Sequence, residues 1–173
     1  MKSAFDNMND NKRKVENWID GEISKSSSDR YEIVTDSATG EQCASVIMST
    51  EQDVEAAIHS SREALKTWSQ TPVLRRARVM FKLKELIERD KKKIAKIITQ
   101  EHGKVLDDAE GSIQRGLEVV EFACGIPHLI KGEFNDQVGT GVDSFSMRQP
   151  LGICVGITPF NFPAMVPLWM FPL

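Results

Sequence analysis

Residues 148–173 read RQPLGICVGITPFNFPAMVPLWMFPL. Within this run, 151–157 carry no charged or amide side chain, β-branched residues stand at Ile153, Val155 and Ile157, and a proline lies near each end. A short apolar run with such boundaries is typical of a strand that is buried on both faces of a parallel sheet. We therefore predict that 151–157 form a fully buried strand, the first of such a sheet.

A stiff loop follows this predicted strand. Pro159 and Pro163 enclose Phe-Asn-Phe, fix φ at their own positions, and bias the residues before them away from helix. Asn161 is thus expected at the carboxyl end of a buried strand, where open α/β sheets bind ligands. Beyond the loop, 164–173 are predicted to begin a helix, with Pro163 near its first turn.

Composition indicates an ordinary globular protein. The 173 residues have a net charge of −3, with 40% apolar and 27% charged residues, which argues against a dedicated nucleic-acid binder. The spacing of Cys43, Cys124 and Cys154 does not suggest a metal site. Apolar neighbours predict that Cys124 and Cys154 are buried and reduced, as in the cytoplasm or, alternatively, the mitochondrial matrix.

Two segments bear on targeting and membranes. Residues 1–16 are polar and are predicted to be a mobile leader, without the apolar core of a signal peptide or the acid-poor composition of a transit peptide. Residues 151–173 have the length of a membrane span, which leaves a tail-anchored basic protein as one alternative. Four prolines in that run argue against it, and we expect no membrane partner.

The rest of the chain is predicted as a β ribbon over 17–48, helices over 49–125 and a strand over 142–149. Asp20-Gly21 indicates a hairpin turn, and Ser49-Thr50 followed by acids indicates a helix start. Apolar stripes at helical spacing follow on both sides of the expected helix end at Gly103. Gly111 and Gly116 would let another element approach the third helix closely. The basic face of the second helix is interpreted as solvated rather than as a nucleic-acid surface.

These elements do not complete a sheet. A strand buried on both faces needs neighbouring strands and covering helices. We therefore expect that 17–173 are an incomplete part of a larger α/β domain.

The loop 159–163, Pro-Phe-Asn-Phe-Pro, resembles the asparagine loop of the aldehyde dehydrogenase superfamily. The run 109–123, AEGSIQRGLEVVEFA, is similar to the CoA-acylating methylmalonate-semialdehyde branch, and so is Phe160, where most of the superfamily has tryptophan. The resemblance extends over 18–173. Weaker matches are Ala38-Thr39-Gly40-Glu41, Trp68 ahead of a proline and arginines, and Glu101-His102-Gly103-Lys104.

The resemblance implies a fold and a reaction. The fold is the N-terminal part of an NAD-binding, Rossmann-like α/β domain, made mostly of helices with a short β ribbon and the first buried parallel strand. The reaction is NAD-dependent oxidation of methylmalonate or malonate semialdehyde to propionyl-CoA or acetyl-CoA with loss of CO2, coenzyme A being a co-substrate. The complete enzyme would be a homo-oligomer, either a dimer or a tetramer.

The resemblance also implies roles for particular residues, each with a plainer alternative. Asn161 would donate its amide N–H to the oxyanion formed during catalysis; from the residues alone it could equally cap the next helix. Ile157, Thr158 and Phe160 would line the NAD site, or simply be a packed strand end. Arg115 would pair with the carboxylate of the semialdehyde, or be one more exposed helix arginine.

One part of the family's chemistry is missing from these residues. The nucleophilic cysteine of the family lies downstream of the asparagine loop, and none of the three cysteines of this chain fits its place. We therefore expect the chain by itself to be inactive. A hydrolytic aldehyde dehydrogenase is the nearest alternative, and a non-catalytic interaction module is the alternative of another class.

Overall fold

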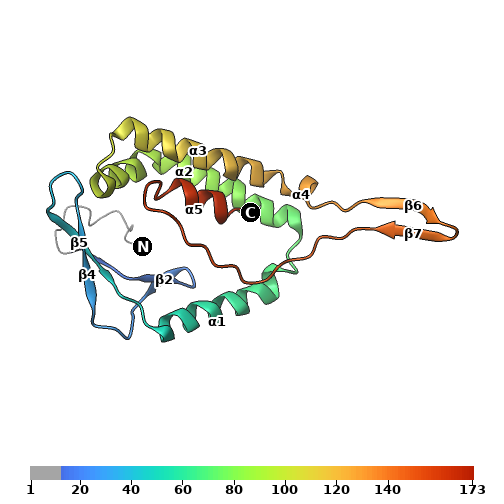
Figure 1. The fold of residues 1–173 in the computed structure, drawn as a ribbon, viewed down its shortest axis with the longest axis horizontal. Helices are drawn as coiled ribbons and strands as arrows, with labels where there is room; N and C mark the ends of the chain where they lie inside the picture. The colour runs from blue at the N-terminus through green and yellow to red at the C-terminus, as the bar shows by residue number, and fades with distance from the viewer. Residues whose placement is uncertain (1–12) are drawn as a thin grey trace. The chain divides into compact units, whose positions relative to one another are not determined.

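A computed structural model describes residues 13–173 of the chain (Figure 1). The chain divides into two units: unit 1 comprises 1–66 and 92–110, and unit 2 comprises 67–91 and 111–173. Helices α2 (Val73–His102) and α3 (Leu106–Cys124) each contribute residues to both units.

Unit 1 contains a three-stranded sheet in the order β1-β5-β4. Strands β4 (Tyr31–Thr35) and β5 (Gln42–Ile47) are antiparallel, and β1 (Lys14–Val15) pairs with β5 in parallel. Most of the predicted leader, residues 1–12, lies outside the described residues. The leader prediction is wrong for Lys14 and Val15, because the β5 backbone, distant in sequence, provides hydrogen-bond partners that local composition does not reveal.

The predicted hairpin is confirmed in unit 1. Strands β2 (Asn17–Ile19) and β3 (Glu22–Ser24) are antiparallel and turn at Asp20 and Gly21, whose φ angles are 56° and 76°. Positive φ at both central residues matches the right-handed twist of the two strands, which is why Asp-Gly predicts such a turn.

Helix α1 (Glu51–Trp68) begins where Ser49-Thr50 predicts it. The Thr50 N–H donates to Asp53 Oδ2 at 2.7 Å, and the Asp53 N–H donates to Thr50 Oγ1 at 3.4 Å. This reciprocal pair supplies partners at the open end of the helix. The Asp53 carboxylate also accepts a hydrogen bond from Ser26 Oγ. These hydrogen bonds hold the pKa of Asp53 below its usual value, and the bond from Ser26 has the largest effect.

Helix α2 ends at His102, as predicted, because Gly103 adopts a positive φ of 84°. Two contacts from unit 1 hold this end of the helix. Ser37 Oγ donates to the Glu101 carbonyl, and Arg13 forms an ion pair with the Glu101 carboxylate at 3.0 Å.

Unit 2 is built on two antiparallel helical segments, the first part of α2 and the last part of α3. Lys84 Nζ lies 3.9 Å from Glu121 Oε2, and Lys91 Nζ donates to Gln114 Oε1 at 3.0 Å. The predicted stripe of α3 is buried here, and the predicted stripe of α2 is buried at Ala77 and Ile87 and half-buried at its other positions in this unit, which agrees with the helical period. The buried apolar residues of these segments are Ala77, Ile87, Ile113, Leu117, Val120, Ala123 and Cys124.

A short helix and an exposed hairpin follow α3 in unit 2. They are α4 (Ile126–Leu129) and the antiparallel pair β6 (Phe134–Gly139) and β7 (Val142–Phe145). The strand predicted over 142–149 is confirmed only for 142–145. Strand β6 is not evident from the sequence because it is rich in Asn, Asp and Gln, which have low strand propensity, and only its pairing with β7 defines it.

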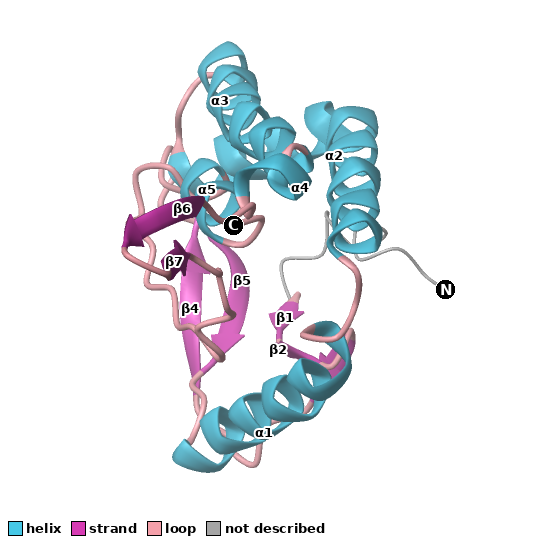
Figure 2. Cartoon of the chain, turned by 90° about the vertical axis from the view of Figure 1, so that its right-hand side faces the viewer, coloured by secondary structure: helices cyan, strands magenta, loops and turns pink. Residues whose placement is uncertain are grey.

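The buried strand predicted at 151–157 is not present. The segment between β7 and α5 (Met165–Met170) is drawn as loop in Figure 2, and it pairs with no strand of the described residues. The side chains of Leu151, Val155 and Ile157 are 96%, 82% and 92% exposed. The prediction fails because a parallel strand is buried only by flanking strands and covering helices, which the described residues do not supply.

The predicted start of a helix after Pro163 is confirmed by α5. None of the helices in residues 13–173 combines the length and the apolar character that crossing a bilayer requires.

We expect the backbone amides of 151–157 to exchange with solvent almost as fast as those of an unfolded peptide, because none has a ladder partner. Amides of 113–123, within α3, should exchange at least about a hundredfold more slowly. Hydrogen exchange followed by mass spectrometry on the 173-residue chain measures both. Equal protection of the two segments would contradict the exposed state of 151–157.

Candidate functional site

The candidate site begins with the asparagine loop, defined here as residues 158–164, which leads into α5. Asn161 is exposed, and its side chain has no hydrogen-bond partner among the described residues. The N-cap of α5 is Ala164, without a side-chain cap hydrogen bond. The capping alternative for Asn161 is therefore wrong, and its amide N–H groups are free to donate to a ligand.

Arg115 lies against this loop. Its Cζ atom is 5.6 Å from the centroid of the Phe162 ring, which is within the range of a cation–π contact. Its Nε donates to Met165 Sδ at 3.4 Å, and its backbone carbonyl accepts from Trp169 Nε1 at 3.3 Å. The structure thus brings the predicted substrate-binding arginine to the predicted catalytic loop, although the two are distant in sequence.

The contact between α3 and α5 depends on a glycine. A Cβ atom added at Gly116 would lie 2.8 Å from Leu168 Cδ1 and 3.0 Å from Leu168 Cβ. No heavy atom lies within 4 Å of the corresponding position at Gly111. The predicted close approach of another element is therefore confirmed for Gly116 and wrong for Gly111.

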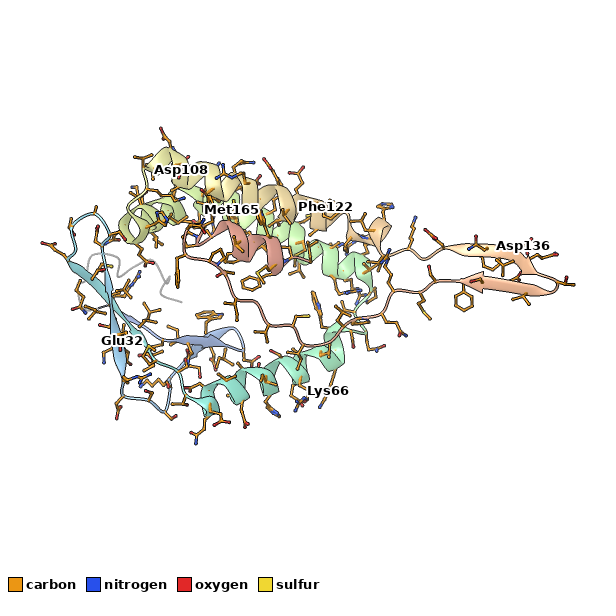
Figure 3. All side chains as sticks on the ribbon, in the orientation of Figure 1. Glu32, Lys66, Asp108, Phe122, Asp136 and Met165 are labelled. Atoms are coloured by element: carbon orange, nitrogen blue, oxygen red, sulfur yellow. The ribbon has the colours of Figure 1, made fainter. Side chains whose placement is uncertain are left out.

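Met165 anchors the start of α5. Met165 is 4% exposed and lies in the first turn of α5 (Figure 3), where its Sδ accepts the hydrogen bond from Arg115 Nε. Sequence analysis did not identify Met165, Phe162 or Trp169 as partners of Arg115. Their separation from it in the chain leaves no periodic signal, and only tertiary packing brings them together.

The residues predicted to line the NAD site lie on the exposed segment and the loop. Ile157 and Phe160 are 92% and 94% exposed, and Thr158 is partly buried. The alternative of a packed strand end is wrong for Ile157 and Phe160 in this structure, because nothing covers them. Their role in binding a cofactor stays a prediction.

The three thiols differ in their surroundings. Burial raises the pKa of Cys124, although the nearby Lys84 opposes this, and burial followed by the Glu101 charge raises the pKa of Cys43. Cys154 is exposed, so the prediction that it is buried is wrong, since its segment has no strand partner. A raised pKa disfavours the thiolate, so Cys43 and Cys124 are not activated as nucleophiles. Within residues 13–173 no group of three His, Cys, Asp or Glu side chains could hold a metal ion.

One family model and several curated relatives match most of the chain. The family described as aldehyde dehydrogenase matches residues 23–173. Malonate-semialdehyde dehydrogenase 2 of Geobacillus thermodenitrificans is 46% identical over 159 residues, which are 92% of this chain and 33% of that protein. A probable methylmalonate-semialdehyde/malonate-semialdehyde dehydrogenase (acylating, mitochondrial) of Caenorhabditis elegans is 48% identical over 92% of this chain and 30% of its own length.

Solved structures of such enzymes have the same fold. Methylmalonate-semialdehyde dehydrogenase from Oceanimonas doudoroffii superposes with a TM-score of 0.89 at 48% identity, covering 92% of this chain and 33% of that one. A putative methylmalonate-semialdehyde dehydrogenase from Sinorhizobium meliloti, complexed with NAD, gives 0.88 at 45% identity, covering 92% and 32%. The predicted α/β class is confirmed.

The chain therefore belongs to the aldehyde dehydrogenase family. Within that family it resembles the malonate- and methylmalonate-semialdehyde dehydrogenases, and it spans about a third of the length of the relatives that it matches.

We expect Gly116→Ala to destabilise unit 2 by about 1–3 kcal/mol, because the new methyl group collides with Leu168 and α5 must move. Gly111→Ala is the matched control. It has open space and should be neutral or stabilising, by up to about 1 kcal/mol of helix propensity. Urea unfolding, with hydrogen exchange of 165–170 as the local measure, compares the two. Equal effects of both substitutions would show that α5 does not pack on Gly116.

Proposed function

We propose that the chain is the N-terminal third of an NAD-dependent, CoA-acylating dehydrogenase of methylmalonate and malonate semialdehyde. The products would be propionyl-CoA or acetyl-CoA, with loss of CO2. The observation that carries this proposal is the position of Arg115 against the asparagine loop. This position would put the Arg115 guanidinium next to the Asn161 amide, which would hold the oxygen of the reacting carbonyl.

The charge of Arg115 suits a substrate with a carboxylate. Arg115 forms no ion pair with any acid among the described residues, so its guanidinium can bind an anionic ligand. Arginine holds a carboxylate through two parallel charge-assisted hydrogen bonds, which a simple aliphatic aldehyde cannot form. The substrate class proposed here therefore follows from an unused cation beside the loop.

Asn161 suits the oxyanion role. When a thiolate attacks an aldehyde, the carbonyl oxygen becomes negatively charged and needs a donor that is already in position. An amide N–H donates and cannot lose its proton, and Pro159 and Pro163 stiffen the loop that carries it. The absence of an internal partner for the Asn161 side chain supports this role.

The attacking thiol is not Cys43, Cys124 or Cys154 in this proposal. It belongs to a part of the enzyme outside these 173 residues, so the chain by itself would be inactive. NAD, when bound, would supply the hydride acceptor for the oxidation. The exposed side chains of Ile157 and Phe160, and the partly buried Thr158 between them, fit a segment that lines a nucleotide.

Three finer features rest on the relatives. The word "acylating" in the name of the C. elegans relative supports coenzyme A as the acceptor, with water as the alternative. A homo-oligomer, dimer or tetramer, is proposed by analogy with the family. A cytoplasmic location is proposed, and the word "mitochondrial" in the C. elegans name supports the alternative of the mitochondrial matrix.

A second candidate function is a non-catalytic interaction module. The apolar side chains of 151–157 are exposed and their backbone is unpaired, so this segment could add to a sheet of another protein. Arg115 and Asn161 would have no role in such a module, and the next two experiments therefore separate the candidates.

The completed enzyme is defined here as residues 1–173 joined to the remaining two thirds of the Geobacillus relative. In it, Asn161→Ala should lower kcat by roughly 10²–10³-fold, or about 2.7–4 kcal/mol, the usual cost of one oxyanion donor. NAD affinity should change little. Asn135→Ala, on the exposed β6–β7 hairpin, is the control and should retain full kcat. A kcat within a few-fold of the parent would rule out the oxyanion role.

Arg115→Ala should leave the substrate carboxylate unpaired in a partly desolvated site. The expected loss is about 2–3 kcal/mol, or some 30- to 150-fold in kcat/KM for methylmalonate semialdehyde. Propionaldehyde has no carboxylate, so its kcat/KM should hardly change. The ratio of the two kcat/KM values in the completed enzyme is the measurement, with Arg78→Ala, an exposed arginine of α2, as the control. An unchanged ratio would return Arg115 to the role of a solvated helix residue.

A further inference from the structure

Ser112 lies one turn before Arg115 on α3 and is only 2% exposed. Its Oγ accepts a hydrogen bond from Arg115 Nη2 at 3.3 Å. Met165 Sδ accepts from Arg115 Nε at 3.4 Å, and the Met165 side chain is itself buried. Two buried acceptors therefore contact the guanidinium of an otherwise exposed arginine.

Both acceptors occupy the same edge of that guanidinium. The group is planar and carries its five N–H donors in a fixed fork, in which Nε and Nη2 form one edge. Ser112 and Met165 use this edge. The end edge, formed by Nη1 and the second N–H of Nη2, has no partner among the described residues.

The Phe162 ring restrains the remaining freedom of the guanidinium. The ring centroid lies 5.6 Å from Arg115 Cζ, so one face of the cation rests near the aromatic ring. An exposed arginine would otherwise sample many rotamers, and a binding group that is held in place loses less freedom when the ligand arrives. The contacts made by Arg115 thus select one orientation.

We propose that Ser112 is a positioning residue that aims the free edge of Arg115 at the substrate carboxylate. This inference rests on the proposed function, in which Arg115 binds that carboxylate. Ser112 does not touch the substrate. It occupies the side edge of the guanidinium, so that the carboxylate pairs with the end edge in a bidentate manner. Met165 acts in the same direction as a weaker acceptor, because a thioether sulfur accepts hydrogen bonds poorly.

A purely structural role for Ser112 makes a different prediction. A buried serine that only fills space in α3 would, when replaced, impair folding and every reaction of the enzyme alike. A positioning residue affects only the substrate that carries a carboxylate, and it does so only while Arg115 is present.

The experiment measures kcat/KM for methylmalonate semialdehyde and for propionaldehyde in the completed enzyme. Ser112→Ala should lower the ratio of the two about fivefold, the usual effect of one hydrogen bond. The change should lie mainly in KM for the semialdehyde, because ground-state binding is weakened. Met165→Leu, which keeps the volume and removes the acceptor, should lower the ratio by a smaller factor. Ser61→Ala, at an exposed serine of α1 that bonds to the Ala57 carbonyl, is the matched control and should leave the ratio unchanged.

The double variant Ser112→Ala/Arg115→Ala separates the explanations. If Ser112 acts through Arg115, the double variant has the same ratio as Arg115→Ala alone. A further drop in the double variant, or an equal loss on both aldehydes with Ser112→Ala, would overturn the positioning role. A ratio that responds to Arg115→Ala but not to Ser112→Ala would overturn this inference and leave the proposed function intact. A ratio that responds to neither would overturn both.

Discussion

The close packing of α5 on α3 at Gly116 is the contact on which the candidate site depends. Leu168 occupies the space that a side chain at Gly116 would need. With α5 held there, Met165 and Trp169 reach the side chain and the carbonyl of Arg115, and Phe162 lies beside its guanidinium. A single missing methyl group therefore allows a helix arginine and a distant proline-rich loop to form one site.

The site is defined as much by unused groups as by contacts. Asn161 has an amide without an internal partner, and Arg115 has one guanidinium edge without one, among the described residues. Polar groups left without partners beside ordered neighbours are the groups that a ligand can use. The exposed segment 151–157 is a different case, because its side chains are apolar. It lacks the flanking strands and covering helices that would bury it, rather than a ligand.

Much of the local structure follows from short-range physics and was predictable. The Asp20-Gly21 turn, the Thr50–Asp53 cap and the end of α2 at Gly103 each depend on one or two residues whose backbone preferences are strong. The apolar stripes of α2 and α3 follow from the helical period, which is visible in the spacing of apolar residues along each helix. The asparagine loop was predictable because two prolines restrict it wherever it is placed.

The sequence by itself therefore determined the Asp20-Gly21 turn, the start of α1, the end of α2 and the family, and it identified Asn161 and Arg115 as candidates. Tertiary structure alone decided that Arg115 meets Phe162 and Met165, that Gly116 rather than Gly111 is the contact, and that β6 pairs with β7. It also decided that 151–157 are exposed, although their pattern is that of a buried strand. The physical reason is that capping and turn preferences act within a few residues, whereas burial depends on partners that approach from elsewhere.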